Sequence, residues 1–288
     1  MRIIQIADAC VCCGSTTLAS SPAVLMPFVA QRAYGISPVE ITAAWEMRDL
    51  KQGTSYMPCQ SLQCQACGLL FLNYRFTDAQ LAAIYRGYRD DDYNRERERF
   101  EPGYATTGAS VFLQRNPYIA GIEEWLEPHL GDHPVVLDWG GGDGTNSPFL
   151  GRATVYVHDI SGVALVDGAL PASLRSESVP IPDLVTCSNV LEHVPSPMAV
   201  LNEILPVMGA GTLLYLEVPH EVLIHEHPGS LGLAPLKLHW HEHINFFTPD
   251  SLAKLVANAG LSVVASHSRS VELGDRGCEV QGLLARRA

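Results

Sequence analysis

The chain has 288 residues, of which 47% are hydrophobic, so it can bury the core of one large domain or two small ones. Its formal net charge of −12 argues against nucleic acid as the main partner, because phosphate binding needs clustered lysine and arginine. The sequence contains no apolar run of transmembrane length and no signal-peptide pattern, so we expect a cytoplasmic protein that works on a small molecule and not at a membrane.

Two cysteine pairs, each followed by glycine, stand in the first quarter of the chain, at residues 10–14 and 64–68. Paired C-x2-C knuckles are the arrangement that holds one tetrahedral zinc through four thiolates, which leaves no open position for chemistry. The four expected ligands of this structural zinc are Cys10, Cys13, Cys64 and Cys67. Cys12 and Cys59 lie nearby as alternative ligands, and ordinary buried thiols are the competing interpretation.

Residues 1–75 are expected to form this cysteine module, and residues 76–130 a helical connector. Thr77 and Asp78 can cap a helix at the start of the connector. Residues 86–101 are dense in alternating charge, which is typical of a solvated helix face. A segment that closes over a ligand is the alternative, and it would make the connector a lid.

From residue 131 onward, apolar runs alternate with helical patterns, which predicts a mostly parallel α/β sheet with its ligand at the carboxyl ends of the strands. Strands are predicted at 135–139, 154–159, 184–188, 212–218, 261–267 and 278–285, with a further short one near 176–179. Helices are predicted near 147–152, 196–207 and 249–259. The last two strands are close in sequence with glycines at their junction, which suits an antiparallel final strand.

The strand at 135–139 runs into a loop with three alternating glycines, Gly140, Gly142 and Gly144. Alternating glycines allow the backbone to approach a ligand closely, because no Cβ intervenes. The next strand ends in Asp159, where nucleotide-binding folds place the carboxylate that grips a ribose. The spacing is G-x-G-x-G rather than G-x-G-x-x-G, and Asp138 and Asp143 add negative charge that a pyrophosphate tolerates poorly. A sulfonium ligand would be favoured by that charge, so the loop indicates S-adenosylmethionine rather than a nicotinamide dinucleotide.

Together these motifs resemble a class I S-adenosylmethionine-dependent methyltransferase over residues 131–288. The resemblance rests on Leu-Asp-Trp-Gly-Gly-Gly-Asp-Gly, on His-Asp at 158–159, and on Asp-Leu-Val-Thr-Cys-Ser-Asn-Val-Leu-Glu-His-Val at 183–194. The paired knuckles, followed by Leu-Leu-Phe-Leu-Asn, are similar to the zinc-binding domain of sugar C-methyltransferases. The implied fold is a Rossmann-like, seven-stranded methyltransferase sheet with a small N-terminal zinc-binding domain and a helical connector.

The resemblance also implies roles for single residues. The glycine loop would wrap the methionine half of the cofactor, and Asp159 would bind the ribose hydroxyls, with capping of the following turn as its alternative role. Asn189 and residues 191–193 match the end of the fourth strand beside the transferred methyl, where His193 lines the cofactor or only holds the loop. The expected cofactor-binding residues are Asp138, Gly140, Gly142, Gly144, Asp159 and Asn189.

Residues 241–247, His-Glu-His-Ile-Asn-Phe-Phe, resemble the signature loop of the sugar C-methyltransferases, roughly Tyr-x-Glu-His-x-x-Tyr-Phe. In those relatives the Tyr and His act on the acidic proton next to a keto sugar. Here Trp240 and Phe246 stand at the two tyrosine positions, so the tyrosine base is missing. We also expect no counterpart of the further C-terminal domain of those relatives. We therefore weigh O- or N-methyl transfer, assisted by a histidine, at least equally with C-methyl transfer.

A neutral imidazole with a pKa near 6.5 can accept the departing proton at neutral pH. The candidate catalytic residues are His243, His241 and His193, with Glu242 as an orienting partner. The histidine-rich segment 220–243 could also hold a catalytic divalent metal, since His239, His241 and His243 would share one face of a strand. A polar loop whose histidines make ordinary hydrogen bonds is the interpretation that we favour.

The expected function is methyl transfer to a small polar metabolite, such as a nucleotide-linked sugar or a natural-product intermediate. A non-catalytic S-adenosylmethionine-binding protein, or a zinc scaffold that docks a partner, is the alternative. The sequence leaves the acceptor, the methylated atom and the oligomeric state open.

Overall fold

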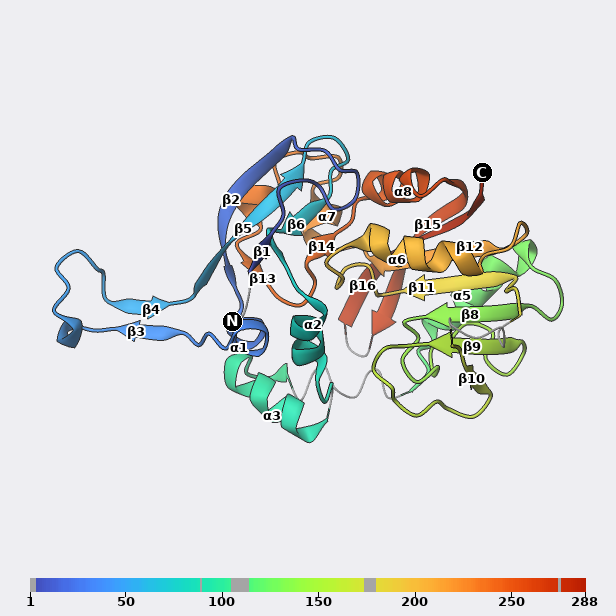
Figure 1. Ribbon diagram of the computed structural model, residues 1–288, viewed down its shortest axis with the longest axis horizontal. Helices are drawn as coiled ribbons and strands as arrows, with labels where there is room; N and C mark the ends of the chain where they lie inside the picture. Colours follow the sequence, from blue (N-terminus) through green and yellow to red (C-terminus); the bar gives the residue numbers. More distant parts are fainter. Residues whose placement is uncertain (1–3, 89, 105–113, 174–179, 274–275) are drawn as a thin grey trace.

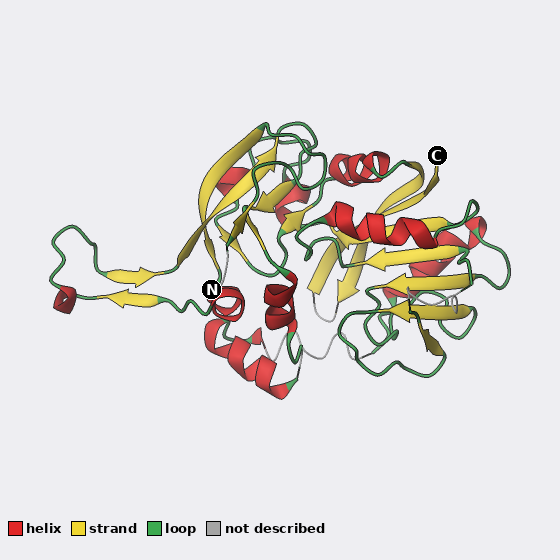
Figure 2. Cartoon of the chain, viewed as in Figure 1, coloured by secondary structure: helices red, strands yellow, loops and turns green. Residues whose placement is uncertain are grey.

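The computed structural model describes residues 4–88, 90–104, 114–173, 180–273 and 276–288. These residues form a seven-stranded sheet and a five-stranded sheet, which lie side by side, and two small two-stranded sheets (Figure 1). Figure 2 shows that strands dominate both halves and that one two-stranded arm projects far from the body. None of the helices in the ranges given is long and apolar enough to cross a membrane.

The seven-stranded sheet has the order β10-β9-β8-β11-β12-β16-β15. Its strands are β8 (Val135–Trp139), β9 (Thr154–His158), β10 (Ala169–Pro171), β11 (Leu184–Ser188), β12 (Leu213–Pro219), β15 (Leu261–Leu273) and β16 (Arg276–Arg287). The strands from β10 to β12 run parallel, and β16 is antiparallel to both of its neighbours. The predicted α/β sheet with an antiparallel final strand is therefore confirmed. The strand predicted near 176–179 lies outside the described residues.

Helices cover both faces of this sheet, which explains why most residues of its central strands are apolar. The helices α6 (Pro197–Ile204) and α8 (Pro249–Asn258) pack on the face that carries Leu137, Val185 and Leu214. The helix α5 (Tyr118–Leu126) packs on the opposite face with Val136 and Leu184. Side chains of Ser196 and Thr248 cap the two helices on the first face.

The helix predicted near 147–152 is wrong, since the chain there forms only turns. Phe149 adopts a left-handed conformation with φ of +63°, which interrupts a right-handed helix. The Ser147 hydroxyl donates to Asp138 Oδ2 at 2.5 Å instead of capping a helix. Ser147 and Pro148, which were expected to cap and begin that helix, therefore do not start one, and Ser147 instead supports the glycine loop through Asp138.

The five-stranded sheet has the order β13-β2-β5-β6-β14. Its strands are β2 (Leu18–Leu25), β5 (Met57–Cys64), β6 (Leu70–Leu72), β13 (His239–Trp240) and β14 (Asn245–Phe246). Both edge strands thus come from the second half of the chain, where β13 pairs with β2 and β14 pairs with β6. The signature loop is therefore fixed at each end to the cysteine module.

The remaining strands, helices and turns are short. Short strands form two further pairs, β1 (Gln5–Ile6) with β7 (Tyr74–Arg75), and β3 (Val39–Ile41) with β4 (Gly53–Ser55) in the projecting arm. The helices are α1 (Pro27–Tyr34), α2 (Asp78–Tyr85), α3 (Asp91–Phe100) and α7 (Val222–Glu226), with 3-10 turns at Ala43–Trp45, Glu127–His129, Leu205–Val207 and Ala234–Leu236. The predicted cap at Thr77 is confirmed by a capping box with Gln80.

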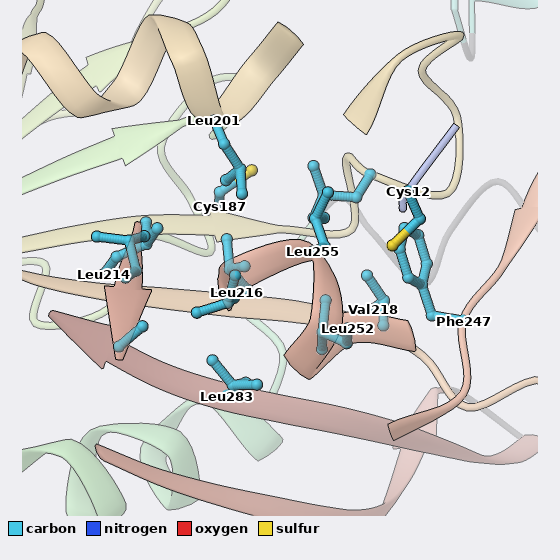
Figure 3. Close-up of a cluster of buried hydrophobic side chains, with 14 of the residues drawn as sticks. Cys12, Cys187, Leu201, Leu214, Leu216, Val218, Phe247, Leu252, Leu255 and Leu283 are labelled. Atoms are coloured by element: carbon cyan, nitrogen blue, oxygen red, sulfur yellow. The ribbon is translucent and has the colours of Figure 1, made fainter. Parts of the chain in front are cut away.

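One apolar cluster joins the cysteine module to the large sheet. Cys12 and Phe247 lie beside Val218 and Leu252 in this cluster, and all four side chains are buried (Figure 3). The cluster continues along the sheet through Leu216 to Leu214. Burial of these side chains makes the two sheets parts of a single packed body.

A buried arginine reinforces the junction between the sheets. The Arg75 guanidinium donates to Asn245 Oδ1 at 2.7 Å and to the carbonyl oxygens of Leu72 and Ile244 at 2.7 and 3.2 Å. Asn245 in turn donates through Nδ2 to the carbonyl oxygens of Leu191 and Val194, both at 2.8 Å. These bonds connect β6 and β7 to the loop after β11.

Replacing Arg75 by methionine should lower the free energy of unfolding by about 3 kcal/mol, because buried acceptors lose a charged donor. Urea denaturation measures this loss. Arg48 is exposed in the projecting arm, and Arg48→Met should change stability by less than about 0.5 kcal/mol. Equal losses in the two variants would show that Arg75 does not join the sheets.

Candidate functional site

The glycine loop follows β8 and lies at the carboxyl edge of the parallel strands. Gly140 and Gly142 have φ values of 78° and 60°, so both use the left-handed region. The Gly140 amide donates to the His158 carbonyl at 2.7 Å, and the Gly142 amide donates to Asp159 Oδ2 at 2.9 Å. The loop is therefore attached to the end of β9, and Asp159 is the group that holds it there.

Asp138 supports the loop from beneath. It is 5% exposed, and its two oxygens accept hydrogen bonds from Ser147 Oγ at 2.5 Å and Thr186 Oγ1 at 2.7 Å. Burial raises the pKa of Asp138 above its usual range. Both oxygens are thus engaged inside the protein, and the carboxylate fixes the positions of the loop and of β11.

Asn189 directly follows β11, at the carboxyl end of that strand. Its φ of 55° is left-handed, and its amide donates to the Glu217 carbonyl at 2.9 Å. The Glu217 carboxylate, 1% exposed, accepts from Tyr118 at 3.2 Å and from Tyr215 at 2.6 Å. Burial raises the pKa of Glu217. Sequence reasoning missed this residue, whose signal was a lone acid inside the apolar strand β12.

Two histidines meet beside the sheet edge, His193 from the loop after β11 and His243 from the segment between β13 and β14. The rings of His193 and His243 contact edge to face with centroids 4.6 Å apart. His193 Nδ1 lies 2.7 Å from the Tyr85 hydroxyl, and His243 Nδ1 lies 2.7 Å from Glu221 Oε1. Glu192 completes the group, with an oxygen 3.6 Å from His193 Nε2. We call Glu192, His193 and His243 the histidine cluster.

The carboxylates set the charge of this cluster. Burial alone would lower the pKa of His243, but the hydrogen bond to Glu221 and the charge of Glu192 outweigh it and raise the pKa to about 9. Burial raises the pKa of Glu192 to about 7. His243 is therefore charged at neutral pH, which differs from the neutral imidazole expected from the sequence.

His241 lies outside the histidine cluster. Its Nδ1 is 3.4 Å from Glu101 Oε1, and its ring contacts that of His239. The prediction that His243 shares a strand face with these two histidines is wrong, because β13 ends at Trp240. The Trp240 indole is itself fully buried and donates to Ser61 Oγ at 2.8 Å, so it packs in the core of the small sheet.

The charge-rich connector reaches the same region through α3. Arg97 is buried and forms a two-point ion pair with Glu242, at 2.9 and 3.1 Å, and a third bond to Glu101. Burial alone would raise the pKa of Glu242, but Arg97 lowers it to about 2. Sequence reasoning assigned this stretch to a solvated face and so missed Arg97, as it also missed Tyr85. The contacts of Arg97 with Glu242 and of Tyr85 with His193 each link residues more than a hundred positions apart.

The four predicted zinc ligands come together on the other side of the junction. Sγ atoms are 3.6 Å apart in Cys10 and Cys67 and 3.5 Å apart in Cys13 and Cys64, and all four lie within 4.8 Å of one another. Cys12 instead donates to the Ser251 carbonyl at 2.9 Å, and Cys59 is buried in a different apolar cluster. The geometry thus separates the four thiols from the two spare cysteines.

A family model described as a methyltransferase domain matches residues 112–266, more than half of the chain. The chain belongs to this methyltransferase domain family. The curated ubiquinone biosynthesis O-methyltransferase of Psychrobacter arcticus is 27% identical over 153 residues, which cover 44% of this chain and 58% of that protein. The match therefore spans less than two thirds of the relative's length.

Solved methyltransferase structures are similar to the chain. One is the 1,6-didemethyltoxoflavin-N1-methyltransferase of Burkholderia thailandensis, with a TM-score of 0.47 and 20% identity over 67% of this chain and 87% of that one. Another is the magnesium protoporphyrin IX methyltransferase of Synechocystis, with a TM-score of 0.44 and 15% identity over 72% of this chain and 97% of that one.

Gly142 and Gly144 of the glycine loop differ in the space around them. A Cβ added to Gly144, where φ is 86°, would lie 2.9 Å from Ala169 Cβ and 3.2 Å from Val157 Cγ2. A Cβ added to Gly142 would meet no described atom within 4 Å. Gly144 is thus required by packing as well as by its backbone conformation.

We expect Gly144→Ala to lower the free energy of unfolding by about 3 kcal/mol, because backbone strain and overpacking add. Gly142→Ala carries the backbone strain alone and should lose about 1 kcal/mol. Thermal and urea unfolding of the pair measures the difference. A smaller loss in Gly144→Ala than in Gly142→Ala would mean that the loop is packed differently.

Proposed function

We propose that this chain catalyses methyl transfer from S-adenosylmethionine to a small polar metabolite. The observation that carries the proposal is the glycine loop attached to Asp159 at the carboxyl edge of the sheet, within a chain of the methyltransferase domain family. The histidine cluster follows β11, the strand next to β8 in the same sheet. Cofactor and acceptor chemistry would thus share one edge of the sheet.

The residues of the loop fit this cofactor. Gly140, Gly142 and Gly144 would accommodate its methionine half, with Asp138 holding the loop from within and Asn189 bordering the site. Asp159 would exchange its bond to the Gly142 amide for the ribose hydroxyls. S-adenosylmethionine supplies a methyl group that is already strongly electrophilic, so the protein has to align the acceptor and accommodate one proton.

The histidine cluster is the part of the chain that we assign to that proton. His193 and His243 lie in it, whereas His241 faces Glu101, so we rank His241 below them. His243 is charged at neutral pH, so it stabilises negative charge on the acceptor rather than taking up a further proton. The proton of the acceptor then passes to His193, or it leaves to solvent when the acceptor binds. Tyr85 holds His193 through the bond to Nδ1.

We further propose that the cysteine module holds a structural zinc through Cys10, Cys13, Cys64 and Cys67. Four thiolates are a complete tetrahedral set for this ion. The knuckle amides of Gly14 and Gly68 donate to the Cys10 and Cys64 carbonyls, both at 2.9 Å, which turns each pair toward the other. This module and the loop of residues 241–247 resemble those of sugar C-methyltransferases. Because Trp240 stands at the position of their tyrosine base and is buried, we propose O- or N-methyl transfer as at least equal alternatives to C-methyl transfer.

Asp159→Asn should weaken S-adenosylmethionine binding at least tenfold, because a charged hydrogen bond to ribose contributes about 2 kcal/mol. Calorimetric titration of the purified protein measures this change. Asp167 is exposed in the segment that follows β9, and Asp167→Asn is the matched control that should bind as the unaltered chain does. Unchanged affinity in Asp159→Asn would remove this residue from the ribose role.

Metal analysis of the purified chain should give about one zinc per chain, and Cys64→Ser should lose both the metal and stability. The matched control is Cys59→Ser, since Cys59 is equally buried but lies in another cluster. A native protein without zinc, or equal zinc loss in the control, would rule out the four-thiolate site.

A further inference from the structure

The histidine cluster has the composition of a metal site as well as that of a proton acceptor. One ligand atom each from Glu192, His193 and His243 lies within 4.8 Å of the other two. The three residues come from two segments about fifty positions apart, which the contacts of Asn245 hold together. Two imidazoles and one carboxylate leave coordination positions open for a substrate or water.

The Glu192 carboxylate is the observation that points to a ligand. The residue is 1% exposed, and among the described residues neither of its oxygens has a hydrogen-bond partner. A buried carboxylate without hydrogen bonds is costly, so such groups are usually paired or bind a cation. Its Oε1 faces His193 Nε2 at 3.6 Å, which is too long for a hydrogen bond. A cation between the two would give the Glu192 carboxylate a partner.

The outer contacts of both imidazoles match those of metal ligands. Histidines that bind a metal through one nitrogen almost always use the other nitrogen in a hydrogen bond to a carboxylate or carbonyl. His243 Nδ1 is held by Glu221 at 2.7 Å, and His193 Nδ1 lies 2.7 Å from the Tyr85 hydroxyl and 3.3 Å from the Glu242 carbonyl. Both rings therefore use Nδ1 in contacts outside the cluster, and His193 Nε2 faces Glu192 within it.

The charge around the cluster favours a cation too. Glu192 belongs to the cluster, and Glu221 contacts it through His243. The nearby Glu242 forms an ion pair with Arg97, which also pairs with Glu101. A divalent ion bound there would contact the same carboxylates and would replace the charged His243 of the proposed function as the group that stabilises negative charge on the acceptor.

We propose that Glu192, His193 and His243 bind a divalent transition-metal ion that holds the acceptor. The ion is of the class that takes imidazole and carboxylate ligands, such as Zn²⁺, Fe²⁺ or Co²⁺, and it is distinct from the four-thiolate zinc. The inference rests on the proposed methyl transfer and specifies the acceptor as a hydroxyl compound. The metal would lower the pKa of the bound hydroxyl, whose proton would leave to solvent. The oxygen would then bond to the methyl carbon while the carbon–sulfur bond of S-adenosylmethionine breaks and S-adenosylhomocysteine leaves.

Cobalt is the probe for this site, because Co²⁺ bound by nitrogen and oxygen lacks the thiolate charge-transfer absorption that Co²⁺ at the cysteine site would show. We expect the zinc-loaded full chain to bind about one additional Co²⁺ without that absorption, measured by equilibrium dialysis and optical spectroscopy. Glu192→Gln should weaken this binding at least tenfold, and His243→Gln should do the same. His227→Ala is the control, since His227 is exposed and lies outside the cluster.

Calorimetry with S-adenosylmethionine on the same samples separates the two proposals. Cofactor binding that persists in Glu192→Gln while Co²⁺ binding is lost supports the metal site and shows that the variant is folded. Absence of additional Co²⁺ in the unaltered chain, binding only with thiolate absorption, or equal affinity in Glu192→Gln would overturn the metal site. Each of these results would leave the cofactor proposal intact if S-adenosylmethionine still binds.

Discussion

The structure depends on the two hydrogen bonds that the amides of Ile244 and Asn245 donate to the Glu192 carbonyl, at 2.7 and 3.1 Å. They join the edge of the five-stranded sheet to the loop after β11 of the seven-stranded sheet. The Asn245 side chain accepts a hydrogen bond from Arg75 and donates to the carbonyls of Leu191 and Val194, on either side of residues 192–193. A displacement at this junction would separate His193 from His243, so the cysteine module acts on the site through its sheet.

Buried acids are the second feature that organises the site. Asp138, Glu192 and Glu217 are each at most 5% exposed, and each lies at or beyond the carboxyl end of a parallel strand. Asp138 is satisfied by two hydroxyls and Glu217 by two tyrosines, so their roles are to position the strands and loops. Glu192 differs because its oxygens have no such partners among the described residues. Two of these buried acids therefore position strands and loops, and Glu192 is the one that we propose as a metal ligand.

Local patterns in the sequence were sufficient for six of the seven strands of the large sheet and for the cysteine cluster, whereas the edge strand β10 was not predicted. The strands at 135–139 and 184–188 were predicted with their observed ends, because glycines, prolines and acids bound each apolar run. The strand at 239–240 and the pairing of residues 245–246 with β6 were not predicted, since two-residue strands carry no periodicity. Contacts such as Arg97 with Glu242 depend on tertiary packing between distant segments, which a single sequence does not display. The helix at 147–152 failed for a related reason, as a tertiary bond to Asp138 used the hydroxyl of its expected cap.

The central claim is that the glycine loop and Asp159 form a site for S-adenosylmethionine. The most direct test is calorimetric titration of the purified full chain with S-adenosylmethionine, S-adenosylhomocysteine and NAD in parallel. We expect micromolar binding of both sulfur nucleosides and no binding of NAD. The glycine loop has the shorter G-x-G-x-G spacing and carries acidic residues, which a pyrophosphate tolerates poorly. Binding of NAD without the two sulfur nucleosides would contradict the central claim.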